Sequence, residues 1–174
     1  MGDIWYSEKS SAGWNVPILL PSPINTEFDE SHPCFTNNGT IYFHSARGEN
    51  SRDADIYRAK YFNNKFEEPE RLDASINSSS FQAAPFISPD ESYIIYFQKN
   101  FTEKTKSELC LSYKKGENLW TTPINLVAKL NLKADDVITA KLSPDGKYLF
   151  ILDSGDVYWV SAKVIEELKP KELK

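Results

Sequence analysis

The segment WNVPILLPSPIN, residues 14–25, recurs as FEEPERLDASIN at residues 66–77 and as WTTPINLVAKLN at residues 120–131. Each copy keeps an aromatic residue first, proline fourth, leucine seventh, isoleucine or leucine eleventh and asparagine last. The copies are spaced by 52 and 54 residues, a period typical of tandem structural units. The sequence therefore predicts an array built from copies of one unit.

Other features repeat in step with this segment and predict four short strands, A to D, in each copy. A turn rich in Asn, Asp and Gly joins A to B, because these residues tolerate tight hairpins. The quoted segment is D, where proline fits an outermost strand because it has no N–H to donate. The turns lie at residues 36–39, 88–91 and 143–146, the B strands at 40–43, 93–97 and 148–151, and the C strands at 3–6, 55–58, 108–111 and 156–159.

Four antiparallel strands per unit predict the blades of a β-propeller, which needs at least about four blades to close. The expected fold is all-β, with about three blades plus an extra strand. Such a partial propeller stays open unless a missing segment or another copy completes it. The expected repeat region is 1–161, with blade parts 3–25, 26–77, 78–131 and 132–161, followed by a charged tail, 162–174, with a short helix over 164–168.

Composition narrows the function classes. A net charge of −5 without a basic stripe argues against nucleic acid as a partner. The longest apolar runs are about five residues, far below the roughly 20 that span a bilayer. Cys34 and Cys110 fall at non-equivalent points of the repeat, which favours two free thiols. Two sets of repeated aromatic residues are expected to fill the space between neighbouring blades: Trp14, Phe66 and Trp120, and likewise Tyr42, Tyr96 and Phe150.

Residues 3–160 resemble the WD40-like PD40 repeats of bacterial propellers, the group related to the propeller of the translocation protein TolB. The resemblance is carried by the turn Ser143–Gly146, by the Ile-Asn pairs that end the first two copies of the quoted segment and by the acidic-aliphatic-aromatic start of strand C. It implies a six- or seven-bladed propeller, often exported to the periplasm or secreted, that usually serves in binding or docking. Some such propellers instead gate serine peptidases or are joined to catalytic domains. The amino terminus carries no signal-peptide pattern.

Propeller ligands usually bind where the loops from D to A meet the central channel. Here these loops are residues 26–32, 78–84 and 133–139. A rim rich in carboxylates suits a hard cation such as calcium or a cationic partner, and the alternative is a solvated acidic loop. The candidate ligand-rim residues are Glu27, Asp29, Glu30, His32, Gln82, Asp135 and Asp136. Glu30 and Gln82 are equivalent when counted back from Pro33 and Pro85.

No catalytic residue is assigned from the sequence, since no nucleophile elbow, phosphate-binding loop or zinc spacing occurs. A base formed by His32 with Asp29 or Glu30 is a weaker alternative to an ordinary loop histidine. We expect a non-enzymatic binding or scaffold module for a protein, peptide or glycan, without a cofactor. The alternative is the propeller part of a saccharide- or peptide-processing enzyme. Self-association that completes the ring is a further expectation.

Overall fold

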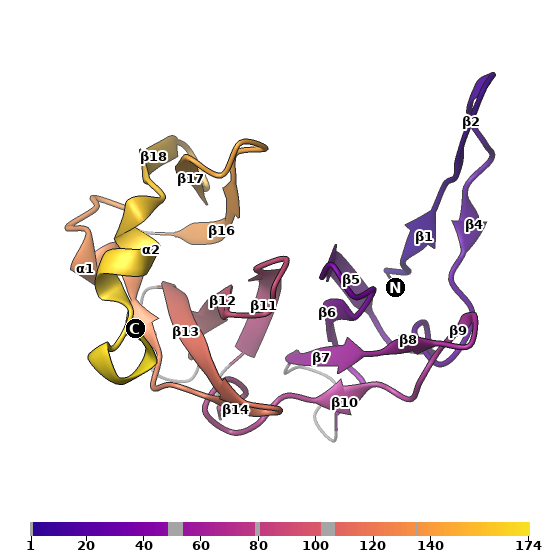
Figure 1. Cartoon of the computed structure of the whole chain (residues 1–174), viewed down its shortest axis with the longest axis horizontal. Helices are drawn as coiled ribbons and strands as arrows, with labels where there is room; N and C mark the ends of the chain where they lie inside the picture. The colour runs from indigo at the N-terminus through magenta and orange to yellow at the C-terminus, as the bar shows by residue number, and fades with distance from the viewer. Residues whose placement is uncertain (1, 49–53, 79–80, 102–106, 135) are drawn as a thin grey trace.

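The structure, a computed structural model, describes residues 2–48, 54–78, 81–101, 107–134 and 136–174. Within these ranges most residues in regular elements belong to β-strands, and every strand pair is antiparallel. The predicted all-β class is confirmed. Figure 1 shows the sheets in chain order, from residues 2–20, named here the N-terminal arm, to the C-terminal helix. No helix in the described part of the chain is long and apolar enough to cross a membrane.

Three sheets contain the predicted A, B and C strands, and each is named here by its order in the chain. Sheet I consists of β5 (Glu30–Phe35), β6 (Ile41–Ser45), β7 (Asp55–Ala59) and β10 (Glu70–Arg71). Sheet II consists of β11 (Phe81–Ile87), β12 (Tyr93–Lys99) and β13 (Glu108–Gly116), with β14 (Leu119–Trp120) and β15 (Ile124–Asn125) both paired to β13. Sheet III consists of β16 (Val137–Leu142), β17 (Tyr148–Asp153) and β18 (Val157–Ser161). The N-terminal pair consists of β1 (Trp5–Tyr6) and β4 (Ile18–Leu19).

The predicted outer strand D is wrong in detail. In the first two copies the aromatic residue lies in an extra hairpin, and the edge strand begins after the proline. In the third copy two short strands lie on either side of the proline. The proline separates the two because it has no N–H for a ladder. The extra hairpins are β2 (Lys9–Ser10) with β3 (Gly13–Trp14), and β8 (Tyr61–Phe62) with β9 (Lys65–Phe66).

The predicted terminal helix is present as α2 (Lys163–Leu168), followed by the 3-10 turn η1 (Lys171–Leu173). Helix α1 (Leu126–Lys129) was not predicted. It forms in the third copy of the repeat, where Val-Ala-Lys replaces the prolines and turn-forming residues of the other copies. The Asn125 side chain caps it by accepting the Ala128 N–H at 3.0 Å.

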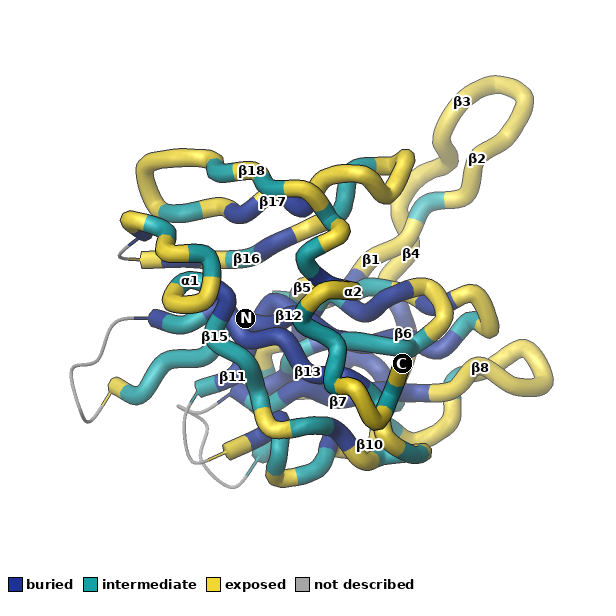
Figure 2. The backbone as a smooth tube through the Cα atoms, turned by 60° about the vertical axis from the view of Figure 1, so that its left-hand side comes forward, coloured by how far each residue is buried: buried dark blue, intermediate teal, exposed yellow. Residues whose placement is uncertain are grey.

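Each sheet has a backward face, toward the preceding sheet, and a forward face, toward the next, because strand side chains alternate. On β12, Ile94 and Tyr96 pack backward with Tyr42 of sheet I. Ile95 packs forward with Leu149 and other side chains of sheet III. Successive sheets are thus held together by buried apolar layers, and Figure 2 shows β12 and β13 buried over much of their length.

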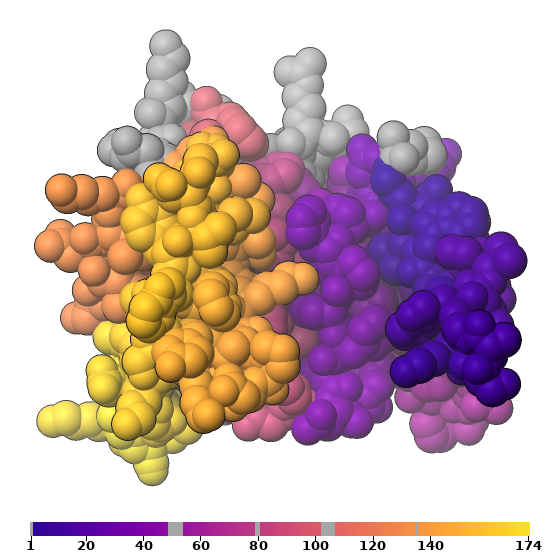
Figure 3. All heavy atoms as spheres, turned by 90° about the horizontal axis from the view of Figure 1, so that it is seen from above, coloured from indigo at the N-terminus to yellow at the C-terminus, as the bar shows by residue number. Residues whose placement is uncertain are grey.

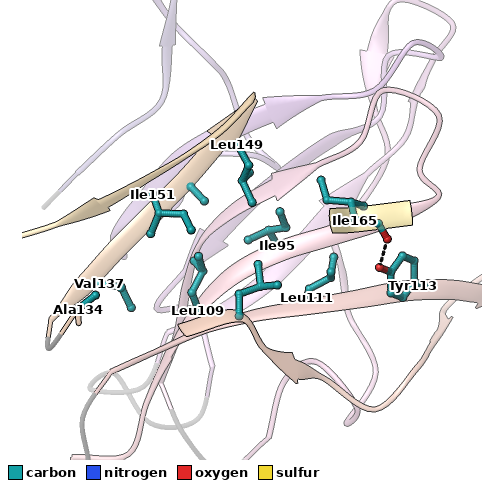
Figure 4. Close-up of a cluster of buried hydrophobic side chains, with 11 residues drawn as sticks. Ile95, Leu109, Leu111, Tyr113, Ala134, Val137, Leu149, Ile151 and Ile165 are labelled. Carbon is teal, nitrogen blue, oxygen red and sulfur yellow. Dashed lines mark hydrogen bonds between the residues drawn. The ribbon is translucent and has the colours of Figure 1, made fainter. Parts of the chain in front are cut away.

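The layer between sheets II and III includes α2. Figure 4 shows Ile165 of α2 in the same cluster as Ile95, Leu111 and Ile151. The Tyr113 hydroxyl donates to the Ile165 carbonyl oxygen, which joins β13 to the helix. The C-terminal helix therefore completes the core of this layer.

The repeated asparagine closes the first two copies in the same way. The Asn77 side chain accepts from the Ile56 N–H at 2.8 Å, and it donates to the carbonyl oxygens of Ile56 at 2.9 Å and Leu72 at 3.0 Å. Asn25 makes the three corresponding bonds to Ile4 and Leu20. In the third copy Asn131 is instead exposed after α1, with φ of 53°.

The repeated turns occupy equivalent places, with a left-handed residue in each. Their φ values are 85° at Gly39, 60° at Glu91 and 71° at Gly146. The first turn is one residue shorter, as the closing pairs Phe35–Ile41, Ile87–Ile94 and Leu142–Leu149 show. The forward-facing residues that follow these pairs are therefore Tyr42, Ile95 and Phe150.

The predicted packing of the repeated aromatic residues is correct only where a neighbouring sheet covers them. Tyr42 and Tyr96 are buried between sheets I and II, although Ile95 and not Tyr96 is the equivalent of Tyr42, and Phe150 is 42% exposed. Trp120 is buried and Phe66 is half-buried, whereas Trp14 is 72% exposed. Trp14 belongs to the N-terminal arm, behind which no sheet lies in the described residues. Cys34 and Cys110 are free thiols, as predicted, and burial raises their pKa to about 11 and about 12.

Candidate functional site

The rim is defined here as the end of the sheets where β5, β11 and β16 begin, formed by residues 26–32, 46–48, 81–84, 99–101, 133–134 and 136. Two of the predicted loops, residues 26–32 and 78–84, need correction because each includes the start of a strand. Glu30 and His32 lie within β5 and Gln82 lies within β11, not in loops. The prolines that suggested a boundary sit at bulges in both strands, where a residue without an N–H is tolerated.

Glu30 is fully buried, and its carboxylate is bonded by donors from β6 and from the segments that flank β5 and β6. Oε1 accepts from the hydroxyls of Thr26 and Ser45, each at 2.7 Å, and Oε2 accepts from the Thr26 N–H at 2.9 Å. Arg47 lies 3.3 Å away through Nη2. This carboxylate therefore fixes the start of β5 and does not face solvent.

Gln82 is the equivalent residue of sheet II, as predicted, and it is also fully buried. Its Nε2 donates to the Ser78 hydroxyl at 2.8 Å. Its Oε1 has no hydrogen-bond partner among the described residues. The amide of Gln82 supplies a hydrogen-bond donor at a position where Glu30 supplies only acceptors. The parts of the rim formed by sheets I and II therefore differ in buried polar groups, although their backbones are equivalent.

The remaining acidic candidates are exposed but do not converge. The Gly2 N–H donates to Asp29, and this bond lowers the pKa of the Asp29 carboxyl. Asp136 lies 3.5 Å from the Lys99 ammonium, and Glu27 is exposed to solvent. Asp135 lies outside the described residues. Within the described ranges no three His, Cys, Asp or Glu side chains gather in a group that could hold a metal ion.

The two histidines meet at the rim through Ser31. The Ser31 hydroxyl lies 2.8 Å from Nε2 of His44 and 3.2 Å from Nδ1 of His32. The rings are stacked with centroids 5.0 Å apart. This arrangement was not predicted, although Ser31 and His44 are cross-strand partners in the β5–β6 hairpin.

The Ala84 N–H sets the direction of these bonds. It donates to Nδ1 of His44 at 3.2 Å, so neutral His44 carries its hydrogen on Nε2. That hydrogen points to the Ser31 hydroxyl oxygen, which also lies within hydrogen-bonding distance of Nδ1 of His32. Burial lowers the pKa of His44 to about 4, with repulsion from His32 adding to the effect. At neutral pH, His44 is therefore a donor to Ser31 and not a base for it.

An aromatic cluster continues the rim from sheet I to sheet II. The ring of Phe81 lies 6.4 Å from His44, 6.0 Å from Phe97 and 5.5 Å from Phe101, measured between centroids. Phe101 is 59% exposed, and the Lys99 ammonium lies 5.6 Å from its ring centre. An apolar surface with a cation at its edge therefore stands beside the polar histidine pair.

A separate groove of about 860 Å³ lies between the N-terminal pair and sheet I. It is lined by Tyr6, Leu20, Phe35, Tyr61 and Phe66, among others. The position of Phe35 corresponds to that of Ile87, which is buried against sheet I. The groove thus lies where strands A and B of a complete unit would stand, since β1 pairs only with β4 in the described residues.

No family model matches the chain, and no curated protein matches it either. The resemblance to PD40 repeats therefore stays a prediction from the residues.

Proposed function

We propose that the chain is an arc of a β-propeller and acts as a non-enzymatic binding module, with a protein, peptide or glycan ligand held at the rim. The blade assignment is supported by the shared strand order and by face-to-face packing. Contacts of β11 with both β5 and β16 also support it, because the first strands of neighbouring blades adjoin around the axis of a propeller.

The observation that carries the binding role is the mixed surface at Phe101. An exposed ring that packs edge-on against Phe81 is held by a neighbour, so its ordering cost on binding is reduced. Lys99 adds a cation, and His32 and Asp29 add polar groups within the same rim. Aromatic anchors beside polar side chains are characteristic of binding surfaces, and loops on rigid strands often carry them.

The test is binding of the labelled protein to peptide and glycan arrays, followed by titration of any ligand found. Phe101→Ala removes the rim ring, and Phe62→Ala removes a similarly exposed ring from the β8–β9 hairpin. We expect Phe101→Ala to bind the ligand at least tenfold more weakly, a loss of about 1.4 kcal/mol, and Phe62→Ala to bind it with unchanged affinity. No ligand on either array, or equal affinities for the two variants, contradicts the proposal.

The alternative role in a saccharide- or peptide-processing enzyme draws on the 2.8 Å contact between Ser31 and His44. An activated serine needs an unprotonated nitrogen facing it, and the bond from Ala84 puts the hydrogen of His44 on that side. A fluorophosphonate probe, which labels activated serines, is therefore expected to leave Ser31 unmodified. Labelling of Ser31 would favour the enzyme.

A further inference from the structure

The last sheet exposes the face that the two earlier sheets bury. On the B strand, Tyr42 of sheet I and Ile95 of sheet II are fully buried, whereas the equivalent Phe150 is 42% exposed. Phe150 is thus an aromatic residue at an interface position that has no next sheet in the described chain.

The neighbouring C strand shows the same change. Val157 and Trp159 of β18 are 61% and 63% exposed. Their equivalents in sheet II, Leu109 and Leu111, are buried in the layer against sheet III. Tyr148 extends this surface, since its ring packs edge-on against Trp159 with centroids 5.3 Å apart. The forward face of β17 and β18 is therefore largely apolar, and Lys141 of β16, the partner of Phe150, adds an exposed cation beside it.

The N-terminal arm exposes the opposite kind of face. Trp5 is 56% exposed, although the equivalent Tyr57 and Cys110 are buried against preceding sheets. Trp14 is exposed where Trp120 is buried. Figure 3 shows the two ends, indigo and orange to yellow, on opposite sides of the molecule. One end of the chain thus has a free forward face, and the other has a free backward face.

We propose that these two faces bind each other between two copies of this chain, head to tail. Within the described chain, the forward faces of sheets I and II are covered by the backward faces of sheets II and III. Among the described residues the N-terminal arm supplies a free backward face, so a second copy offers the surface that the internal layers use.

The exposed area supports an interface. Aromatic side chains carry about 150–250 Å² each, so the forward face of sheet III exposes several hundred Å² of apolar surface. Contiguous patches larger than a few hundred Å² are rare on monomers, and a stable interface buries roughly 800 Å² per partner. Unlike faces give a heterologous contact, which forms a ring if the rotation closes and an open chain if it does not.

The experiment measures the molar mass of the protein by sedimentation and light scattering between micromolar and submillimolar concentrations. We expect the unaltered protein to exceed the monomer mass. Trp159→Glu and Trp14→Glu each disrupt one of the two faces, so each variant alone is expected to be monomeric. Phe62→Glu is the control, because Phe62 is similarly exposed but lies in the β8–β9 hairpin.

Mixing the two monomeric variants gives the decisive result. Each retains one intact face, so an equimolar mixture is expected to form a dimer and nothing larger. A monomeric unaltered protein overturns the proposal, as does self-association of Trp14→Glu, which would mean that like faces pair. Circular dichroism of each variant verifies folding, and Phe150→Glu replaces Trp159→Glu if that variant unfolds. The proposal depends on the sheet arrangement and not on the rim, so loss of ligand binding by Phe101→Ala and loss of association are separate results.

Discussion

The first three strands of sheets II and III have the same order, and β12–β13 pairs in the same register as β17–β18, yet sheet II is covered on both faces and sheet III on one. Tyr93 to Phe97 and Tyr148 to Leu152 are both aromatic and aliphatic runs. The first is largely buried, and the second alternates between buried and exposed residues, as Figure 2 shows along β17. In a repeat array the position of a unit therefore decides whether its side chains are buried, whereas the residue pattern only makes their burial favourable.

The largest expected effect tests this directly with two equivalent forward-facing positions. Ile95→Ala removes a fully buried side chain and is expected to lower the free energy of unfolding by about 2–5 kcal/mol. Phe150→Ala is expected to cost less than about 1 kcal/mol, because the ring is partly in water. Urea unfolding at low protein concentration, where copies do not associate, measures both. Equal losses would show that sheet III is covered in solution.

A second test uses pH to probe His44, a half-buried residue of sheet I two places after Tyr42. His44 has a pKa of about 4 in the folded protein, because of burial, against about 6.5 when unfolded. The unfolded chain therefore binds a proton first as pH falls below 6.5, and stability decreases toward pH 4 by up to about 3 kcal/mol. His44→Asn keeps an acceptor for the Ala84 N–H and is expected to flatten this decrease. Identical pH profiles of unfolding free energy for the two proteins would contradict the assignment.

A third test compares the asparagines of the second and third copies. Asn77→Ala leaves backbone groups of Ile56 and Leu72 buried without partners and is expected to cost about 2–3 kcal/mol. Asn131→Gly is expected to change the free energy of unfolding by less than about 0.5 kcal/mol, since Asn131 is exposed and glycine adopts its positive φ freely. Thermal unfolding of both variants measures the difference, and a comparable loss for Asn131→Gly would imply a bond that the geometry lacks.

The smallest effect concerns the turns. Gly146→Ala is expected to destabilise by about 1 kcal/mol through its φ of 71° alone, because nothing lies within 4 Å of the added Cβ. In sheet II the same place holds Glu91, whose carboxylate accepts from the Tyr42 hydroxyl at 3.2 Å and from Lys114 at 2.6 Å. Those neighbours offset the strain there. A stabilised Gly146→Ala protein in urea unfolding would contradict this reasoning.

The sequence predicted the elements that depend on local chemistry. The turns, the strands A to C and α2 follow from residue patterns within a few positions, and the structure has them. The exposure of Trp14 was not predictable, because it depends on whether a sheet lies behind the N-terminal arm. Helix α1 was missed because four residues give too short a pattern to detect.

The candidate site was predictable only in part. Counting back from the prolines paired Glu30 with Gln82 correctly. The burial of Glu30, however, depends on Ser45 of β6 and on Arg47 in the segment after it, which only the folded structure brings to the carboxylate. The contact between Ser31 and His44 requires the register of a bulged hairpin. The surface at Phe101 was visible only as one aromatic residue in a charged loop, and its contact with Phe81 depends on the folded structure.

The asparagine side chains of the first two copies bond only to main-chain atoms of the strands they join. These bonds do not depend on which side chains fill the apolar layers on either side. The side chains of a duplicated unit can therefore diverge widely while the asparagine bonds that join its last two strands stay the same. Chimaeras that exchange units between distant sequences should tolerate the exchange when the cuts fall just after this asparagine.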